Sequence, residues 1–118
     1  MADASGFIEF VRDQLRPWGG VVARRMFSSQ GLFRNGTMFA LVHDDTLYFR
    51  TDARSVADFA AAGMAPFRYS RSGRVVALDY HAVPAAVLDE ADRLAAWAET
   101  AYAAALRRAQ ARPRRKRK

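Results

Sequence analysis

The residue types that carry most enzyme chemistry are scarce in this 118-residue chain. It has no cysteine, which excludes a thiolate nucleophile, a disulfide framework and a zinc site built from thiolates. One histidine, His43, precedes Asp44-Asp45, and the other, His81, lies two residues after Asp79. Residues two apart in a strand share a face, so Asp79 and His81 could both reach one metal ion. We favour a polar strand edge beside a turn, because so few ligands rarely make a metal site.

Nucleophile and nucleotide motifs do not change this interpretation. Ser28-Ser29 could offer a hydroxyl nucleophile, but no Gly-x-Ser-x-Gly elbow surrounds the pair, and a turn explains it. The sequence contains neither Gly-x-Gly-x-x-Gly nor a P-loop. The paired carboxylates of Asp89-Glu90 fall where a turn or helix start is expected. We therefore predict that the protein is not an enzyme and uses no cofactor or metal, and a small hydrolase or metal enzyme is the least favoured hypothesis.

The motif Arg24-Arg25-Met26-Phe27 is more unusual, because two arginines stand inside an apolar strand. Alternation places Arg24 with Met26 on one face and Arg25 with Phe27 on the other. One arginine should then face the core side or lie over an aromatic ring. We favour a structural role, in which an arginine ties down a carboxylate or loop carbonyls, because a buried guanidinium first needs partners. The alternative is contact with an anion or a partner.

The net charge of +7 comes from the C-terminal end of the chain. Residues 107–118 hold eight of the 19 basic residues and no acidic residue, so residues 1–106 carry a net charge of −1. The eight are Arg107, Arg108, Arg112, Arg114, Arg115, Lys116, Arg117 and Lys118. Such a cluster is typical of contact with a phosphate backbone, which is salt-dependent and does not read sequence. A solubilising, nonspecifically sticky terminus explains it equally well.

The elements that must position these residues follow from the apolar periodicity. Helical spacing predicts a helix through Leu15, capped by Asp3 or Ser5 and ended at Pro17 and the following glycines. Beyond it the period changes to two. The predicted strands are 21–27, 31–34, 37–43, 46–50, 67–70 and 74–80, with turns at Asn35-Gly36, Asp44-Asp45 and Ser72-Gly73.

Two further helices complete the predicted order. A short helix over about 53–61 is capped by Thr51 or Asp52, and a long alanine-rich helix runs from Pro84 to about Ala109. We predict an α+β domain: an antiparallel sheet of about five to six strands, with an N-terminal helix, a short middle helix and a long C-terminal helix covering one face. Residues 1–106 form the domain, and 107–118 form a basic tail that we expect to be disordered beyond Arg112.

The chain shows no feature of a membrane or secreted protein. No apolar run approaches the length of about 18 to 20 residues that spans a bilayer. The N-terminus lacks the basic and apolar regions of a secretory signal. We therefore expect a cytoplasmic protein with no membrane contact.

Several segments together carry a family signature. They are Arg24-Arg25-Met26-Phe27, Gly31-Leu32-Phe33, 38–41 and 45–50, and then 59–63, Pro66-Phe67, 73–80, Val83-Pro84 and the closing helix with Trp97. The pattern, over roughly residues 5 to 105, resembles the N-terminal domain of the TfoX/Sxy family. That resemblance implies a bacterial cytoplasmic α+β protein, similar to secretion-chaperone-like folds. Full-length members regulate natural competence, act with the cyclic-AMP receptor protein and carry a second helical domain, where this chain has its basic tail.

The family brings no catalytic residues to this sequence, and its motif marks Arg24, Arg25, Met26, Phe27 and Gly31 as candidate partner contacts. We therefore predict a non-enzymatic regulatory module. Its partner would be a protein, such as part of the transcription machinery, or a second copy in a homodimer. The sheet face or the alanine-rich helix would be the docking surface. The alternative is nonspecific nucleic-acid binding through the basic tail.

Overall fold

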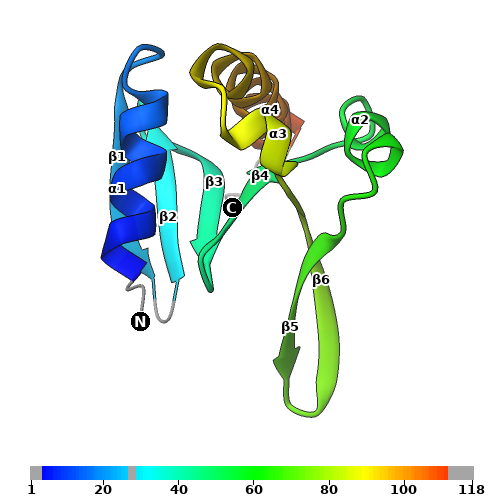
Figure 1. Ribbon diagram of the computed structural model, residues 1–118. Coiled ribbons are helices and arrows are strands. Elements are labelled where there is room, and N and C mark those ends of the chain that lie inside the picture. The colour runs from blue at the N-terminus through cyan, green and yellow to red at the C-terminus, as the bar shows by residue number, and fades with distance from the viewer. Residues whose placement is uncertain (1–3, 27–28, 112–118) are drawn as a thin grey trace, which may run out of the picture.

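A six-stranded antiparallel sheet forms the centre of the structure (Figure 1). The computed structural model describes residues 4–26 and 29–111. The strands are β1 (Val21–Met26), β2 (Ser29–Arg34), β3 (Thr37–His43), β4 (Thr46–Arg50), β5 (Pro66–Arg71) and β6 (Arg74–Ala82). They lie in the order β1-β2-β3-β4-β6-β5, and every neighbouring pair is antiparallel. The predicted α+β class and sheet are confirmed.

Three hairpins of this sheet, β2–β3, β3–β4 and β5–β6, turn through pairs of residues with positive φ. Such pairs make the type I′ turns whose twist matches that of the flanking strands. The φ values are 51° and 79° at Asn35 and Gly36, 52° and 55° at Asp44 and Asp45, and 51° and 78° at Ser72 and Gly73. All three predicted turns are confirmed, and they fix the register of β2–β3, β3–β4 and β5–β6.

The helices are α1 (Ala4–Leu15), α2 (Val56–Ala61), α3 (Ala85–Leu88) and α4 (Ala91–Ala111). The prediction of one unbroken helix from Pro84 was wrong, because α3 ends at Leu88 and α4 begins at Ala91, with Asp89-Glu90 between them. The side-chain amide of Gln14 on α1 donates to the carbonyl of Leu88 at 2.9 Å, so α3 ends against α1. The carbonyl of Glu90 then accepts the N–H of Leu94 at 2.8 Å and begins α4.

All four helices contribute buried side chains to one apolar core on one face of the sheet. Figure 1 shows α1 alongside β1 and β2, with α3 and α4 next to it, while the β5–β6 hairpin projects beyond these helices. The predicted apolar stripe of α1 is confirmed, since Ile8, Val11 and Leu15 are buried. The helices therefore cover one face of the sheet, as expected from the order of the elements.

A β-bulge in β3 places an extra aromatic ring in this core. Leu32 of β2 pairs with Ala40, but Phe33 pairs with Met38, so Phe39 has no partner on β2. Phe39 and Ala40 are both fully buried on the helix side. Met38 consequently lies on the opposite face from its neighbour Phe39.

Small side chains let α4 lie close to the sheet. Its buried positions are Leu94 and the alanines Ala98, Ala101, Ala104 and Ala105. A methyl group at these positions fills the space beside β3 and β4, with which α4 makes its sheet contacts. The alanine-rich composition of the predicted C-terminal helix thus serves its close approach to the sheet.

This packing predicts that Ala98→Leu lowers the free energy of unfolding by about 1–3 kcal/mol, because the added atoms have no space. The matched control is Ala96→Leu on the exposed side of the same helix, which should change stability by less than about 0.5 kcal/mol. Urea unfolding of both variants measures the difference. Equal effects at the two positions would contradict the close packing of α4.

Candidate functional site

The face of the sheet opposite the helices carries a second apolar cluster. Leu41, Phe67 and Tyr80 are buried there. Met38, Tyr48, Tyr69 and Leu78 are half-buried and pack against them. Within the part of the chain that the structure describes, this cluster receives no helix residue. We call this side of the sheet the open face.

A groove of about 620 Å³ lies on the open face. Strands β1, β2, β3, β5 and β6 supply its lining, which consists of Met26, Ser29, Met38, Leu41, His43, Phe67, Tyr69, Arg71, Leu78 and Tyr80. Thioether, aliphatic and aromatic groups make up most of this surface. Among the described residues, no carboxylate lines it. The groove is therefore apolar, with positive charge at its edge.

Aromatic rings hold the β5–β6 hairpin against the central strands. The ring of Phe67 packs edge-to-face against His43 at 5.3 Å and against Tyr48 at 5.0 Å, measured between centroids. Tyr69 stacks on Phe67 at 6.1 Å. Edge-to-face contacts of this kind stabilise a cluster beyond the area that it buries. The wall of the groove is thus built by rings that contact one another.

Gly31 has a packing role on this face. A Cβ atom at Gly31 would lie 2.7 Å from the sulfur of Met26, 3.0 Å from the ring of Phe33 and 3.2 Å from the sulfur of Met38. Real Cβ atoms essentially never approach sulfur so closely. The glycine of the family motif therefore lets two methionines and a ring meet over β2.

The arginine pair of the motif is exposed rather than buried. Arg24 and Arg25 both face solvent, because β1 is an edge strand. The guanidinium of Arg24 lies 5.4 Å from the ring centroid of Phe33, which confirms the expected aromatic contact. Neither arginine pairs with a carboxylate of the described residues. The favoured interpretation as a buried tie was therefore wrong, and Phe27 lies outside the described residues.

Positive charge continues around the open face. The guanidinium of Arg50 lies 5.0 Å from the ring centroid of Tyr80. Burial raises the pKa of the Tyr80 hydroxyl, and the charge of Arg50 opposes that rise. A second hollow of about 450 Å³ shares the lining residue Met38 with the groove and lies against the end of α4, where Arg50, Ala105 and Arg108 line it. Arg71 and Arg74 occupy paired positions at the tip of the β5–β6 hairpin.

The two histidines lie on different faces and bond to hydroxyl groups. His43 Nδ1 lies 2.8 Å from Ser29 Oγ in the groove. His81 Nδ1 lies 3.0 Å from Thr51 Oγ1, and burial lowers its pKa. In residues 4–26 and 29–111, no group of three or more His, Cys, Asp or Glu side chains could hold a metal ion. The predicted proximity of Asp79 and His81 does not amount to a ligand set there.

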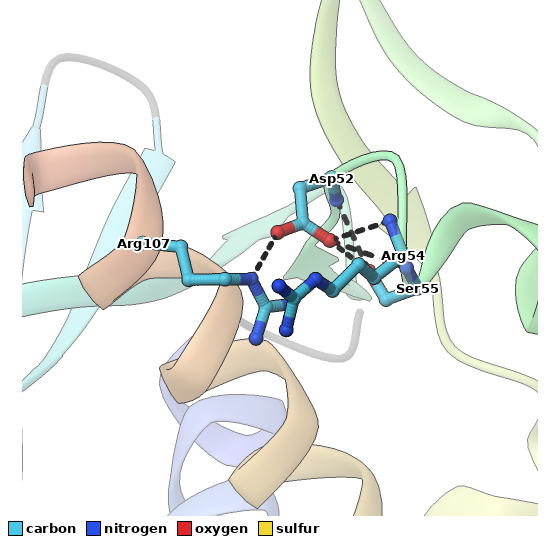
Figure 2. Close-up of polar contacts among 4 residues, drawn as sticks. All are labelled: Asp52, Arg54, Ser55 and Arg107. Atoms are coloured by element: carbon cyan, nitrogen blue, oxygen red, sulfur yellow. Dashed lines mark hydrogen bonds and ion pairs between the residues drawn. The ribbon is translucent and has the colours of Figure 1, made fainter. Parts of the chain in front are cut away.

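The tail residue Arg107 has a structural partner. Its Nε donates to Asp52 Oδ2 at 2.7 Å, which joins α4 to the loop before α2 (Figure 2). The other oxygen, Oδ1, accepts the backbone N–H groups of Arg54 and Ser55 at 3.1 and 3.2 Å. Asp52 thus caps the turn that leads into α2. The prediction that it caps a helix starting at about residue 53 was wrong, because α2 begins at Val56 with Ser55 at its N-cap position. The hydrogen bond from Arg107 is the main reason why the pKa of Asp52 falls from 3.8 to about 2.

The C-terminal arginines therefore divide into two groups. Arg107 is occupied by Asp52, whereas Arg108 is exposed on α4 and lines the smaller hollow. Arg112, Arg114, Arg115, Lys116, Arg117 and Lys118 lie outside the described residues. The part of the predicted tail that the structure describes is the end of a helix.

Comparison with protein-family models decides the family. The TfoX N-terminal domain matches residues 13–105 of the 118-residue chain. The chain belongs to this family. No curated protein matches it.

The match extends from α1 into α4, so this TfoX N-terminal domain contains the whole sheet and both faces described above. The predicted strand over 74–80 places Leu78 and Tyr80 on one face by alternation, but the sequence did not single out the groove around them. None of the helices in the described part of the domain is long and apolar enough to cross a membrane.

The Asp52 contacts predict that two substitutions of this residue destabilise the TfoX N-terminal domain to different extents. Asp52→Ala should lower the free energy of unfolding by about 2 kcal/mol at pH 7, because the cap and the ion pair are both lost. Asp52→Asn should lower it by about 1 kcal/mol, because an amide oxygen can still cap the turn. Urea unfolding measures both values.

The same pair predicts a pH dependence. The folded-state pKa of Asp52 is depressed, so its stabilising effect is present above pH 3.8 and is lost as the pH falls toward about 2. The stability difference between wild type and Asp52→Asn should shrink over this interval. A difference that stays constant would show that the carboxylate charge does not matter.

Proposed function

We propose that this TfoX N-terminal domain is a non-enzymatic regulatory module that binds a protein partner through the open face. The groove around Leu41, Phe67 and Leu78 is the observation that carries this proposal. Apolar patches that are rimmed by polar groups commonly mark interaction sites, because a partner removes them from water. Pocket walls of thioether and aromatic groups suit side chains of a partner protein.

Family membership supports a regulatory use of this binding. The resemblance implies regulation of transcription during natural competence in a bacterial cytoplasm, and we propose that role for the chain. In that role the domain would contact the transcription machinery through the open face, because the opposite face of the sheet is already covered by α1 to α4. The domain would therefore act by binding a partner protein rather than by catalysis.

The proposal predicts that an open-face variant loses partners which a helix-side variant keeps. Tyr69→Asp places a charge in the groove, whereas Arg93→Glu changes an exposed residue of α4 outside both hollows. Affinity purification from the source cells, followed by mass spectrometry, should yield proteins that bind wild type and Arg93→Glu but are reduced at least about tenfold with Tyr69→Asp. Circular dichroism checks that both variants are folded. Identical protein sets for all three chains would contradict the proposal.

The alternative function is nonspecific nucleic-acid binding through residues 107–118. The observation that favours it is the excess of six basic residues in 112–118 with no acidic residue. The exposed Arg108 at the end of α4 adds one more positive charge. Such a segment binds phosphates without reading bases.

This alternative predicts that a chain ending at Ala111 loses affinity for duplex DNA at low salt. Ending there keeps the Arg107–Asp52 pair, so the chain should melt at an unchanged temperature. The full chain should show a slope of roughly −5 in a plot of log affinity against log salt concentration, from about 0.9 per neutralised phosphate. Equal DNA binding by the two chains would contradict the alternative.

A further inference from the structure

We infer that the occupant of the groove is an acidic, apolar segment of a partner protein: a short peptide whose apolar anchors are flanked by Asp or Glu. This inference rests on the proposed function, because it names the chemistry of the partner that the open face would bind. It follows from the charge around the groove, from the shape of its walls and from the poor fit of other occupants.

Among the described residues, the charged side chain in the lining of the groove is an arginine. Arg71 lines the groove itself, and the guanidinium of Arg50 lies 5.0 Å from the ring centroid of Tyr80, which also lines the groove. Arg74 pairs in register with Arg71 at the hairpin tip. Among the described residues, no carboxylate lines the groove or the second hollow. Carboxylates on the partner would complement this potential and speed association.

Two arginines on the helix side, Arg34 and Arg107, already have carboxylate partners. Arg34 lies 3.7 Å from Glu99, and Arg107 lies 2.7 Å from Asp52. Arg71, Arg74 and Arg108 form no ion pair with any residue in 4–26 or 29–111. Their guanidinium groups therefore remain able to form bidentate bonds with carboxylates of a partner.

The walls of the groove suit protein side chains better than nucleobases. Met26 and Met38 bring flexible, polarizable thioethers, which adapt to different apolar anchors. A base-stacking platform needs free ring faces. Here Phe67 is buried, and its ring is in contact with His43, Tyr48 and Tyr69. The open face therefore favours a peptide over single-stranded nucleic acid.

Two occupants from the same chain fit poorly. A two-fold dimer would bring together two copies of the same patch, whose described lining includes Arg71 and no carboxylate that could pair with it. The segment 112–118 carries six basic residues and would be repelled by Arg71 and Arg74. An acidic segment of another protein is the occupant that the charges favour.

The test is a selection from a random-peptide phage library on the immobilised full chain. We expect enriched peptides to combine apolar or aromatic residues with an excess of Asp and Glu. Fluorescence anisotropy of the enriched peptides should show weaker binding as salt increases. Arg71→Glu should weaken binding about tenfold or more, and Arg93→Glu should leave it within about twofold. Arg71 and Arg93 are both exposed, so both variants should fold.

The results separate this inference from the proposed function. Enriched peptides that are apolar but not acidic, and that Tyr69→Asp no longer binds, would leave the open-face site standing and overturn the inference. If the wild-type chain enriches no peptides beyond those that Tyr69→Asp also enriches, both the inference and the proposed function are overturned. If a single-stranded oligonucleotide displaces the peptides, the occupant of the groove is a nucleic acid and the inference is overturned. If light scattering shows a dimer of the wild-type chain and a monomer of Tyr69→Asp, the occupant is a second copy of the chain and the inference is overturned.

Discussion

The rest of the structure depends on the close contact between α4 and strands β3 and β4. Alanines at the contact let the helix lie near the sheet, and the bulge at Phe39 fills the space beside it with a ring. Trp18 and Tyr102 pack edge-to-face on Phe39 at 5.1 and 6.4 Å, so α4 and the end of α1 share one aromatic core. Because all four helices use their apolar sides here, no helix in the described part of the chain covers the other face of the sheet.

Electrostatic contacts reinforce the same asymmetry. On the helix side, the indole N–H of Trp18 donates to Glu99 at 2.8 Å, and the guanidinium of Arg34 lies 3.9 Å from the centroid of the Trp18 ring. Asp52 and Arg107 fix the other end of α4. These contacts hold the elements of the helix side in place. The arginines of the open face lie beside an apolar groove instead, where they can act in recognition.

Much of the fold could be predicted from local signals. Positive-φ turns such as Asn35-Gly36 and the alternation of the strands depend on neighbouring residues only. The break at Asp89-Glu90 could not be predicted, because Gln14 from a distant helix ends α3. The Asp52–Arg107 pair and the groove likewise join residues that are far apart in the sequence. The exposure of Arg24 and Arg25 could not be predicted, because the sequence does not show that β1 lies at the edge of the sheet.

We therefore propose that the two faces of one sheet have different tasks, the helix face in stability and the open face in recognition of a partner segment that occupies the groove. The most direct measurement is amide chemical-shift mapping of the full chain during titration with an acidic, apolar peptide. We expect perturbations concentrated at β3, β5 and β6 around Leu41, Phe67 and Leu78, with α1 and α4 up to Ala105 unchanged. Perturbations concentrated on the exposed side of the helices, or spread evenly over the domain, would contradict the proposal.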